Sequence, residues 1–481
     1  METNVKNKKR IKQNKIVKAG LGYTIGNYFL KGLSFFTIPL FTRLLTTQDY
    51  GKYNTFLSYE NILFVLLGFA IHSSYKNARY KFGVDQEDKN NYYSYSSASI
   101  LLIIVSASGW LLCVNVFCKQ LSAWLQMDVL CLNFLVCYAF GNAVITCFNS
   151  DAGIEYKYQD FLKISGANAI LNIILSIVLI VVEFPDEKYV GRIAGSTIAI
   201  TLVAIYVVRK FFQRSKPKNN VNFWKWGLKY SIPIIPHGLS QIVLGQFDRI
   251  MIMNMVSGSM AGIYSFAYNI YAIVQVTANS LDSVWGPWFY EKRKNEDLDS
   301  IKRYSSYYAF FMFLFSSLII FLSPEIVKFL ARKDYWEAVY SVIPIIAGGY
   351  FAFLYTIPSN VEYYHGKTKY IAIGTMLAAV INIILNYIFI KKCGYIAAAY
   401  TTLVTYFLYF VFHYILARKI EGIFLFSNKM LFKCSIGMLV IVWIGNVLID
   451  SLPIRMLIVL LILAISFCYE EKNTGILKRR K

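Results

Sequence analysis

The sequence lacks long polar stretches, and their absence excludes a soluble domain of useful size. Only 16% of the 481 residues are charged, whereas soluble domains carry about 25%. Acidic side chains are scarce, with 27 Asp and Glu against 49 Lys and Arg, while 57% of the residues are hydrophobic. The mean hydropathy of +0.47 therefore predicts an all-α polytopic membrane protein.

Motifs that hold nucleotides, metals or catalytic nucleophiles are also missing. Gly366-Lys367-Thr368 resembles the end of a phosphate-binding loop, but the first glycine of that motif would have to stand where Val361 does. The four histidines and eight cysteines form neither CxxC nor a metal-binding His motif. We therefore expect no cofactor, no metal site, no catalytic residues and no direct use of ATP.

What the sequence contains is a series of fourteen apolar segments separated by short loops. Most are near the ~20 residues that cross a ~30 Å hydrocarbon core. They cover residues 18–41, 53–72, 96–117, 121–148, 161–182, 191–211, 229–256, 260–288, 304–322, 338–360, 369–390, 395–416, 430–449 and 453–469. The sequence thus predicts about fourteen transmembrane helices.

Lysine and arginine are concentrated in alternate loops. With the N-terminus in the cytoplasm and residues at segment ends assigned to the adjoining loops, 36 of these 49 residues lie inside, 11 outside and 2 within the membrane. Cytoplasmic loops of membrane proteins carry such an excess, so both termini are predicted to be cytoplasmic. We attribute the net charge of +22 to this orientation beside an anionic leaflet and expect no nucleic-acid partner.

Weak internal similarity divides the chain into two halves. Gly51-x-Tyr53 matches Gly262-x-Tyr264, and residues 172–175 match residues 382–385, at offsets of 210 to 211. Both halves start on the cytoplasmic side, which predicts parallel repeats of six helices. The expected domains are an N-terminal six-helix bundle (1–212), a cytoplasmic linker (213–228), a second six-helix bundle (229–420), and a two-helix hairpin with a basic tail (421–481).

Polar residues inside apolar segments are the candidates for function, since a charge there costs about 3 kcal/mol unless it meets water, protein or a partner. Lys31 lies deep in the first segment, among aromatic residues. It is either a cavity-lining cation for an anionic substrate or a structural lysine paired with a neighbouring helix. Under an offset of 206 residues, His237 occupies the matching place in the second half.

Three carboxylates and one further cation lie in similar places. Asp248 and Arg249 are adjacent, so their side chains point ~100° apart on a helix and each should meet a different partner. A structural clamp explains them as well as a substrate site does. Glu60 and Asp282 are candidates for titration during transport, although carboxylates at segment ends are often merely hydrated.

Asparagines at i, i+4 spacing give segments five and eleven a polar stripe each. The stripe residues are Asn168, Asn172, Asn382 and Asn386. Interhelical hydrogen bonding explains such stripes at least as well as sugar recognition. Five prolines are expected to interrupt helices of the second half, where freed carbonyls need protein or a wet cavity; they are Pro233, Pro236, Pro287, Pro344 and Pro358.

Taken in order, several motifs resemble the polysaccharide export proteins of the Wzx flippase type, in the multidrug/oligosaccharidyl-lipid/polysaccharide (MOP) exporter superfamily. They are residues 38–45, 49–53, 231–237, 248–249, 261–265, 382–386 and 394–399. The resemblance spans about residues 15–420. It implies two six-helix bundles in a V around a central cavity, and it marks Arg43 and the Asp248-Arg249 pair as motif residues.

The resemblance further implies a transporter of the bacterial cytoplasmic membrane that moves a polyprenyl-pyrophosphate-linked glycan outward by alternating access. We hypothesise that Lys31, His237, Arg249 and Arg43 offset the pyrophosphate charge; Lys31 and His237 are chosen from their burial and repeat position, not from the resemblance. Asp248, Glu60 or Asp282 would couple the movement to H+ or Na+, and polysaccharide-assembly proteins are conceivable partners. The alternatives are a multidrug/cation antiporter, a peptidoglycan-precursor flippase of the same superfamily, and a membrane glycosyltransferase or polymerase.

Overall fold

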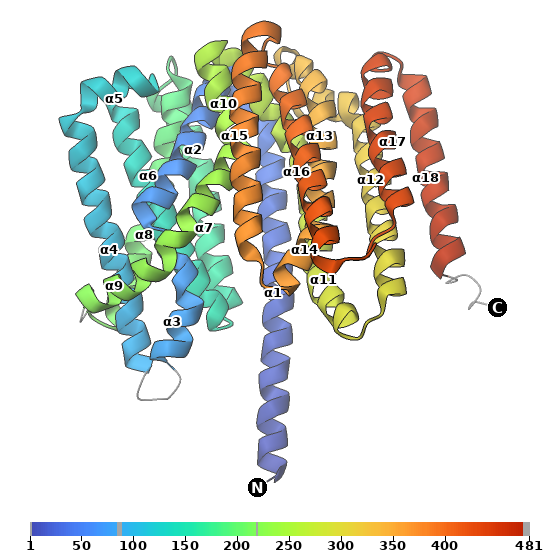
Figure 1. Ribbon diagram of the computed structural model, residues 1–481. Helices are drawn as coiled ribbons and strands as arrows, with labels where there is room; N and C mark the ends of the chain where they lie inside the picture. Colours follow the sequence, from blue (N-terminus) through green and yellow to red (C-terminus); the bar gives the residue numbers. More distant parts are fainter. Residues whose placement is uncertain (1, 84–88, 218–219, 475–481) are drawn as a thin grey trace. The chain divides into compact units, whose positions relative to one another are not determined.

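The computed structural model describes residues 2–83, 89–217 and 220–474, and every regular element in these ranges is helical (Figure 1). Each of the fourteen apolar segments is largely helical. The longer helices are α1 (Glu2–Leu44), α2 (Thr47–Gly68), α4 (Lys89–Val116), α6 (Val129–Ile154), α7 (Tyr158–Val178), α8 (Lys188–Arg214), α10 (Ile235–Met255), α11 (Gly258–Lys294), α12 (Leu298–Leu330), α13 (Val339–Leu354), α15 (Thr368–Cys393), α16 (Ala397–Glu421), α17 (Asn428–Val447) and α18 (Leu452–Thr474). Short elements are α3 (Tyr75–Phe82), α5 (Cys118–Leu125), α9 (Asn220–Ser231) and α14 (Thr356–Tyr364), with single turns η1 (Ile71–Ser74), η2 (Leu179–Glu183), η3 (Ile232–Ile234) and η4 (Lys333–Ala338).

The apolar helices confirm an all-α membrane protein. In the described part of the chain, nine helical spans are long and apolar enough to cross a bilayer. A tenth is the pair formed by α2 and the η1–α3 segment, which is bent by 53° at residues 69–70. The apolar part of α18, Leu452–Ser466, is shorter. The total of fourteen crossings stays a prediction.

The chain forms two compact units. Unit 1 comprises Met1–Leu45 and Lys52–Ile242, and unit 2 comprises Thr46–Gly51 and Val243–Lys481. The first turn of α2 therefore belongs to unit 2, and the first turns of α10 belong to unit 1. Neither exchange was expected from the apolar pattern, which placed the boundary in a linker at residues 213–228.

Much of the expected linker is helix α9, which packs against unit 1. The indole Nε1 of Trp224 donates a hydrogen bond to the carbonyl of Ala98, at 2.7 Å. Phe223 is buried, and Trp226 packs edge-on against Phe82 and Tyr95. The aromatic residues that suggested an interfacial anchor thus fix the segment to α3 and α4, because their rings find a preformed aromatic cluster there.

Close helix packing in unit 1 depends on small side chains. Gly195 of α8 faces the backbone of Ser176 on α7, where a Cβ atom would overlap the serine backbone. Gly141 of α6 has a similarly tight approach to Ile200 of α8. The hydrophobic effect does not drive helices together inside a bilayer, so their association depends on the close packing that small residues allow. Helix α8 accordingly forms the inside of unit 1, with 72% of its apolar window buried.

Unit 2 is built around α13, and 83% of the apolar window in Lys333–Tyr364 is buried. Helices α11, α12 and α16 pack around it. The expected C-terminal hairpin, α17 and α18, packs on α12 through Leu314, Phe321 and Val459. Arg455 of α18 also donates to Glu325 of α12 at 2.7 Å and to the carbonyl of Phe321 at 2.9 Å.

The first turn of α2 crosses α11 at two glycines. A Cβ atom on Gly51 would overlap the carbonyl oxygen of Gly258, and a Cβ atom on Gly262 would overlap that of Thr47. Nearby, the side chain of Asn269 donates to the hydroxyl of Tyr50 at 2.7 Å. These contacts explain why the first turn of α2 belongs to unit 2.

The prolines correct one expectation. Pro287 and Pro344 lie inside the continuous helices α11 and α13, so they do not interrupt them. A proline removes one backbone donor but the helix axis continues when packing holds the flanking turns. Pro233 does fall in the break at η3, between α9 and α10.

Candidate functional site

Asp248 lies at the centre of a buried polar cluster in unit 2. Its carboxylate is 1% exposed and accepts hydrogen bonds from the hydroxyls of Tyr264 and Tyr268, at 2.5 and 2.9 Å. The backbone N–H of Arg249 donates to its other oxygen at 2.9 Å. These three donors replace part of the water that burial removes from the carboxylate, and they hold it between α10 and α11.

Arg249 contacts one of the residues that also bind Asp248, so the expectation that the two side chains meet different partners is wrong for Tyr268. Its guanidinium lies 4.5 Å from the ring centre of Tyr268, a distance typical of cation–π stacking. The Nε atom of Arg249 is buried and has no hydrogen-bond partner among the described residues. The structure therefore joins Asp248 and Arg249 through one shared tyrosine and leaves a guanidinium donor unused.

The other predicted cations lie in unit 1. Lys31 and Arg43 are exposed on α1. His237 is half-buried near the start of α10, and its Nδ1 atom has no hydrogen-bond partner in the described part of the chain. No described contact joins these three side chains to one another. Their role in substrate binding stays a prediction.

The two remaining carboxylates have separate surroundings. Glu60 on α2 is 2% exposed and accepts a hydrogen bond from the amide of Asn142 on α6, at 3.0 Å. Asp282 on α11 is half-buried, and its Oδ1 atom lacks a hydrogen-bond partner among the residues described. Glu60 thus links two helices of unit 1, whereas Asp282 keeps an unused acceptor in unit 2.

The asparagine stripes link neighbouring helices. Asn172 accepts a hydrogen bond from Arg192 of α8 at 2.7 Å. Asn382 donates to Thr402 of α16 at 3.3 Å, and Asn386 accepts from Thr401. The fourth stripe residue, Asn168, has a buried Oδ1 atom without a partner in the described ranges. Three of the four side chains therefore hold helix pairs together.

Sequence analysis missed Arg192, a buried cation of unit 1. It is 9% exposed, and its guanidinium lies 3.9 Å from the ring centre of Phe41 and 4.5 Å from that of Tyr53. It donates to Asn172, Ser176 and Ser196. Its position at the start of an apolar segment made it look like a loop residue; the paired asparagine stripe was the signal that could have found it.

Replacing Arg192 with leucine is expected to lower the stability of unit 1 by about 2 to 4 kcal/mol. The change removes two aromatic contacts and leaves the half-buried Asn172 and the buried Ser176 without the arginine donor. Thermal unfolding of the detergent-solubilised protein measures the loss. Arg192→Lys is the control. It keeps the charge but not the planar stacking, so its melting temperature should lie between those of wild type and Arg192→Leu. Equal melting temperatures for wild type and Arg192→Leu would contradict this assignment.

A second missed pair lies in unit 2. His413 of α16 and Glu362 of α14 are both fully buried, with Nδ1 and Oε1 at 2.5 Å. The other polar atom of each side chain, His413 Nε2 and Glu362 Oε2, has no hydrogen-bond partner among the described residues. The two residues are 51 positions apart, so no local motif in the sequence could have paired them.

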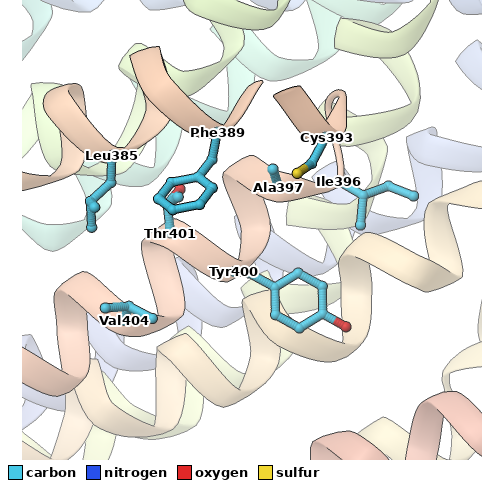
Figure 2. Close-up of a pocket in the computed structure, with 8 residues that line it drawn as sticks. All are labelled: Leu385, Phe389, Cys393, Ile396, Ala397, Tyr400, Thr401 and Val404. Carbon is cyan, nitrogen blue, oxygen red and sulfur yellow. The ribbon is translucent and has the colours of Figure 1, made fainter. Parts of the chain in front are cut away.

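An apolar groove runs between α15 and α16 (Figure 2). It has a volume of about 640 Å³, and its lining residues include Leu385, Phe389, Tyr400 and Val404. None of the lining side chains in the described part of the chain is charged. The groove therefore suits a hydrocarbon chain and cannot hold the charged part of an amphiphile.

The arrangement of helices defines an all-α membrane fold of the MurJ and MATE type. The structure is similar to the lipid II flippase MurJ in an inward closed conformation, with a TM-score of 0.71 and 18% identity, over 94% of this chain and 99% of that one. It is also similar to an inward-facing multidrug resistance MATE family transporter of the MOP superfamily, with a TM-score of 0.64 and 14% identity, over 82% and 94%.

The sequence then identifies the family within that class. Residues 16–292, more than half of the chain, match the profile of the polysaccharide biosynthesis protein family, and the chain belongs to it. A protein of the Lsg locus of Haemophilus influenzae is 22% identical over 388 residues, covering 77% of this chain and 90% of the relative. An uncharacterised membrane protein of the same organism is 21% identical over 378 residues, covering 76% and 88%. These matches confirm the resemblance drawn from the sequence motifs.

Proposed function

We propose that the protein is a flippase that moves polyprenyl-pyrophosphate-linked oligosaccharide units across the bacterial cytoplasmic membrane, for assembly of a surface polysaccharide. The observation that carries the proposal is the family match over residues 16–292. The flippase named among the structural neighbours has the same fold. Both termini would lie in the cytoplasm, as the distribution of Lys and Arg predicts.

The chemistry of such a substrate suits the polar residues of the helices. A pyrophosphate with several sugars cannot cross ~30 Å of hydrocarbon unaided. Lys31, Arg43 and His237 of unit 1, and Arg249 of unit 2, would offset its charge during passage. Arg249 supports this role best, because its Nε donor is buried and has no protein partner among the described residues.

Movement would be coupled to H+ or Na+ through a buried carboxylate. Asp248, Glu60 and Asp282 are the candidates, and Asp248 is the one that lies beside a cation of the binding set. Binding of an ion to one carboxylate changes the cost of holding charge in an apolar helix pair. That change could bias the protein between inward-open and outward-open states.

Deletion of the gene is expected to abolish surface glycan and to accumulate lipid-linked units on the cytoplasmic side. Complementation with Lys31→Gln/Arg249→Gln should fail, because two of the four cations proposed to offset the pyrophosphate charge are lost. Complementation with Lys163→Gln, which removes an exposed lysine of α7, should succeed. Surface glycan and lipid-linked intermediates are measured, with membrane expression of each variant checked by immunoblot.

The same strains separate the alternatives. A deletion that changes drug susceptibility but leaves surface glycan intact would show an antiporter. If the protein rescues growth of a strain depleted of its peptidoglycan-precursor flippase, its substrate is the peptidoglycan precursor. Exported but unpolymerised units would indicate a polymerase or transferase. Normal surface glycan in the Lys31→Gln/Arg249→Gln strain would refute the proposed binding residues.

A further inference from the structure

Unit 1 contains a cationic pocket that none of the predicted site residues lines. It has a volume of about 730 Å³ and lies between the η1–α3 segment and the C-terminal end of α6. His72, Lys76 and Arg79 line one wall, and Asn149 and Ser150 line the other. The three basic residues follow i, i+4, i+7 spacing, which places them on one helical face. No acidic side chain is among the lining residues described.

Arg79 has a guanidinium donor that no described residue uses. Its guanidinium lies 5.0 Å from the ring centre of Tyr92, which fixes its plane. Its Nη1 atom is buried and has no hydrogen-bond partner among the described residues, and the same holds for Oδ1 of Asn149 on the opposite wall. A guanidinium with an unused donor is suited to bind phosphate oxygens, which it matches in geometry.

The carboxylates nearest to the pocket in the chain are already compensated. Asp151 accepts a hydrogen bond from Tyr92 at 2.9 Å and forms an ion pair with Arg214 of α8, at 2.5 Å. Burial acts to raise the pKa of Glu155, but hydrogen bonds from Lys157 and Tyr93 and the charge of Arg214 outweigh it and lower this pKa. Both acids are therefore neutralised on the α8 side, and the positive charge of the pocket is uncompensated.

A second pocket continues from the first toward α1. It has a volume of about 460 Å³ and shares Asn149, Gly153 and Tyr156 with the cationic pocket. Its far wall is formed by Tyr23 and Asn27 of α1, and the Tyr23 hydroxyl is buried without a hydrogen-bond partner in the described residues. This second space is uncharged but offers hydroxyl and amide groups, which suits sugar hydroxyls.

The α1 wall leads onward to Lys31. Tyr23, Asn27 and Lys31 are spaced four residues apart, so they share one face of the helix. The charge distribution places the end of unit 1 that holds α3 in the cytoplasm. Tyr80 and Tyr156 at the rim are 71% and 41% exposed, as expected for aromatic residues at the level of lipid headgroups.

We propose that the two pockets form a cytoplasmic docking site for a lipid-borne phosphate or diphosphate group, with the phosphate at Lys76 and Arg79 and the attached sugar toward Tyr23 and Asn27. The inference rests on the proposed function and adds an entry site to it. The substrate would bind here first and then follow the α1 face to Lys31. The pocket lies wholly within unit 1.

Binding of farnesyl diphosphate to the purified full-length protein in phosphatidylcholine nanodiscs tests the site. We expect saturable binding to wild type, and binding at least about tenfold weaker to Lys76→Gln/Arg79→Gln. The control Lys81→Gln/Lys163→Gln also removes two cations, neither of which lines the pocket, and should bind like wild type. Lys76→Glu alters one exposed side chain, so it serves as a second variant if the double variant unfolds.

The competitors distinguish the sources of the phosphate. Farnesol should not compete, and phosphatidylglycerol should compete much less than the diphosphate. Displacement by phosphatidylglycerol at equal concentration would assign the pocket to a phospholipid headgroup and overturn the entry role. Unchanged binding in Lys76→Gln/Arg79→Gln and in Lys76→Glu would overturn the site itself, even if glycan export by wild type is normal. Failure of the flippase function would instead appear as normal glycan in the deletion strain.

Discussion

Replacing Gly262 with valine is expected to prevent accumulation of folded protein. A side chain at this position would overlap the carbonyl of Thr47 in the first turn of α2, and a backbone carbonyl cannot move aside as a flexible side chain can. Separating the two helices would also break the hydrogen bond between Asn269 and Tyr50. We expect a loss of more than about 4 kcal/mol, measured as the yield of monodisperse protein by fluorescence-detected size exclusion.

Two further variants make this result specific. Gly51→Val should have the same effect, because its Cβ would overlap the carbonyl of Gly258. Gly109→Val on α4 is the control, since nothing lies within 4 Å of a Cβ atom there, and it should accumulate normally. If Gly262→Val accumulates to the same yield as wild type, α2 and α11 do not pack closely enough at this crossing to exclude a side chain.

Replacing Asp248 with asparagine is expected to reduce glycan export at least about tenfold while leaving the protein folded. Asparagine can still accept a hydrogen bond from Tyr264 or Tyr268, so most of the buried cluster is preserved. The negative charge beside Arg249 is lost, and with it the proposed coupling to an ion. Surface glycan is measured together with the melting temperature of the purified variant.

Companion variants separate a coupling role from a structural one. Asp248→Leu leaves two buried tyrosine hydroxyls without an acceptor and should lower stability by about 1 to 3 kcal/mol for each hydroxyl. Tyr268→Phe removes one donor but keeps the carboxylate, so it should retain export. If Asp248→Asn exports glycan like wild type, the carboxylate serves only to hold α10 to α11.

The helices themselves could be predicted from hydrophobic patterning. Each apolar segment is largely helical, since a chain in lipid must satisfy its backbone hydrogen bonds internally. The ends of helices were less predictable. Helix α11 continues to Lys294, beyond the apolar segment that ended at residue 288, because hydrogen bonding within the helix does not stop where the side chains become polar.

The partners of polar residues could not be predicted, because they depend on distant parts of the chain. Asp248 was predicted to matter, but the tyrosines that bind it are 16 and 20 positions away on the next helix. Arg192 and the Glu362–His413 pair were missed for the same reason. The role of Trp224 differed from the expected interfacial anchor because its hydrogen-bond acceptor, Ala98, lies 126 positions earlier.

The glycine crossing also indicates how such a chain could have arisen. The two contacts of the crossing are equivalent: Gly51 faces Gly258, and Gly262 faces Thr47. Gly262 lies 211 positions after Gly51, and Gly258 lies 211 positions after Thr47. A half-length ancestor with one such glycine would have made this contact twice, about the twofold axis of a homodimer. After duplication and fusion of the gene, the two copies of this patch would be encoded separately. A mutation of one glycine would then change one of the two contacts and leave the other intact.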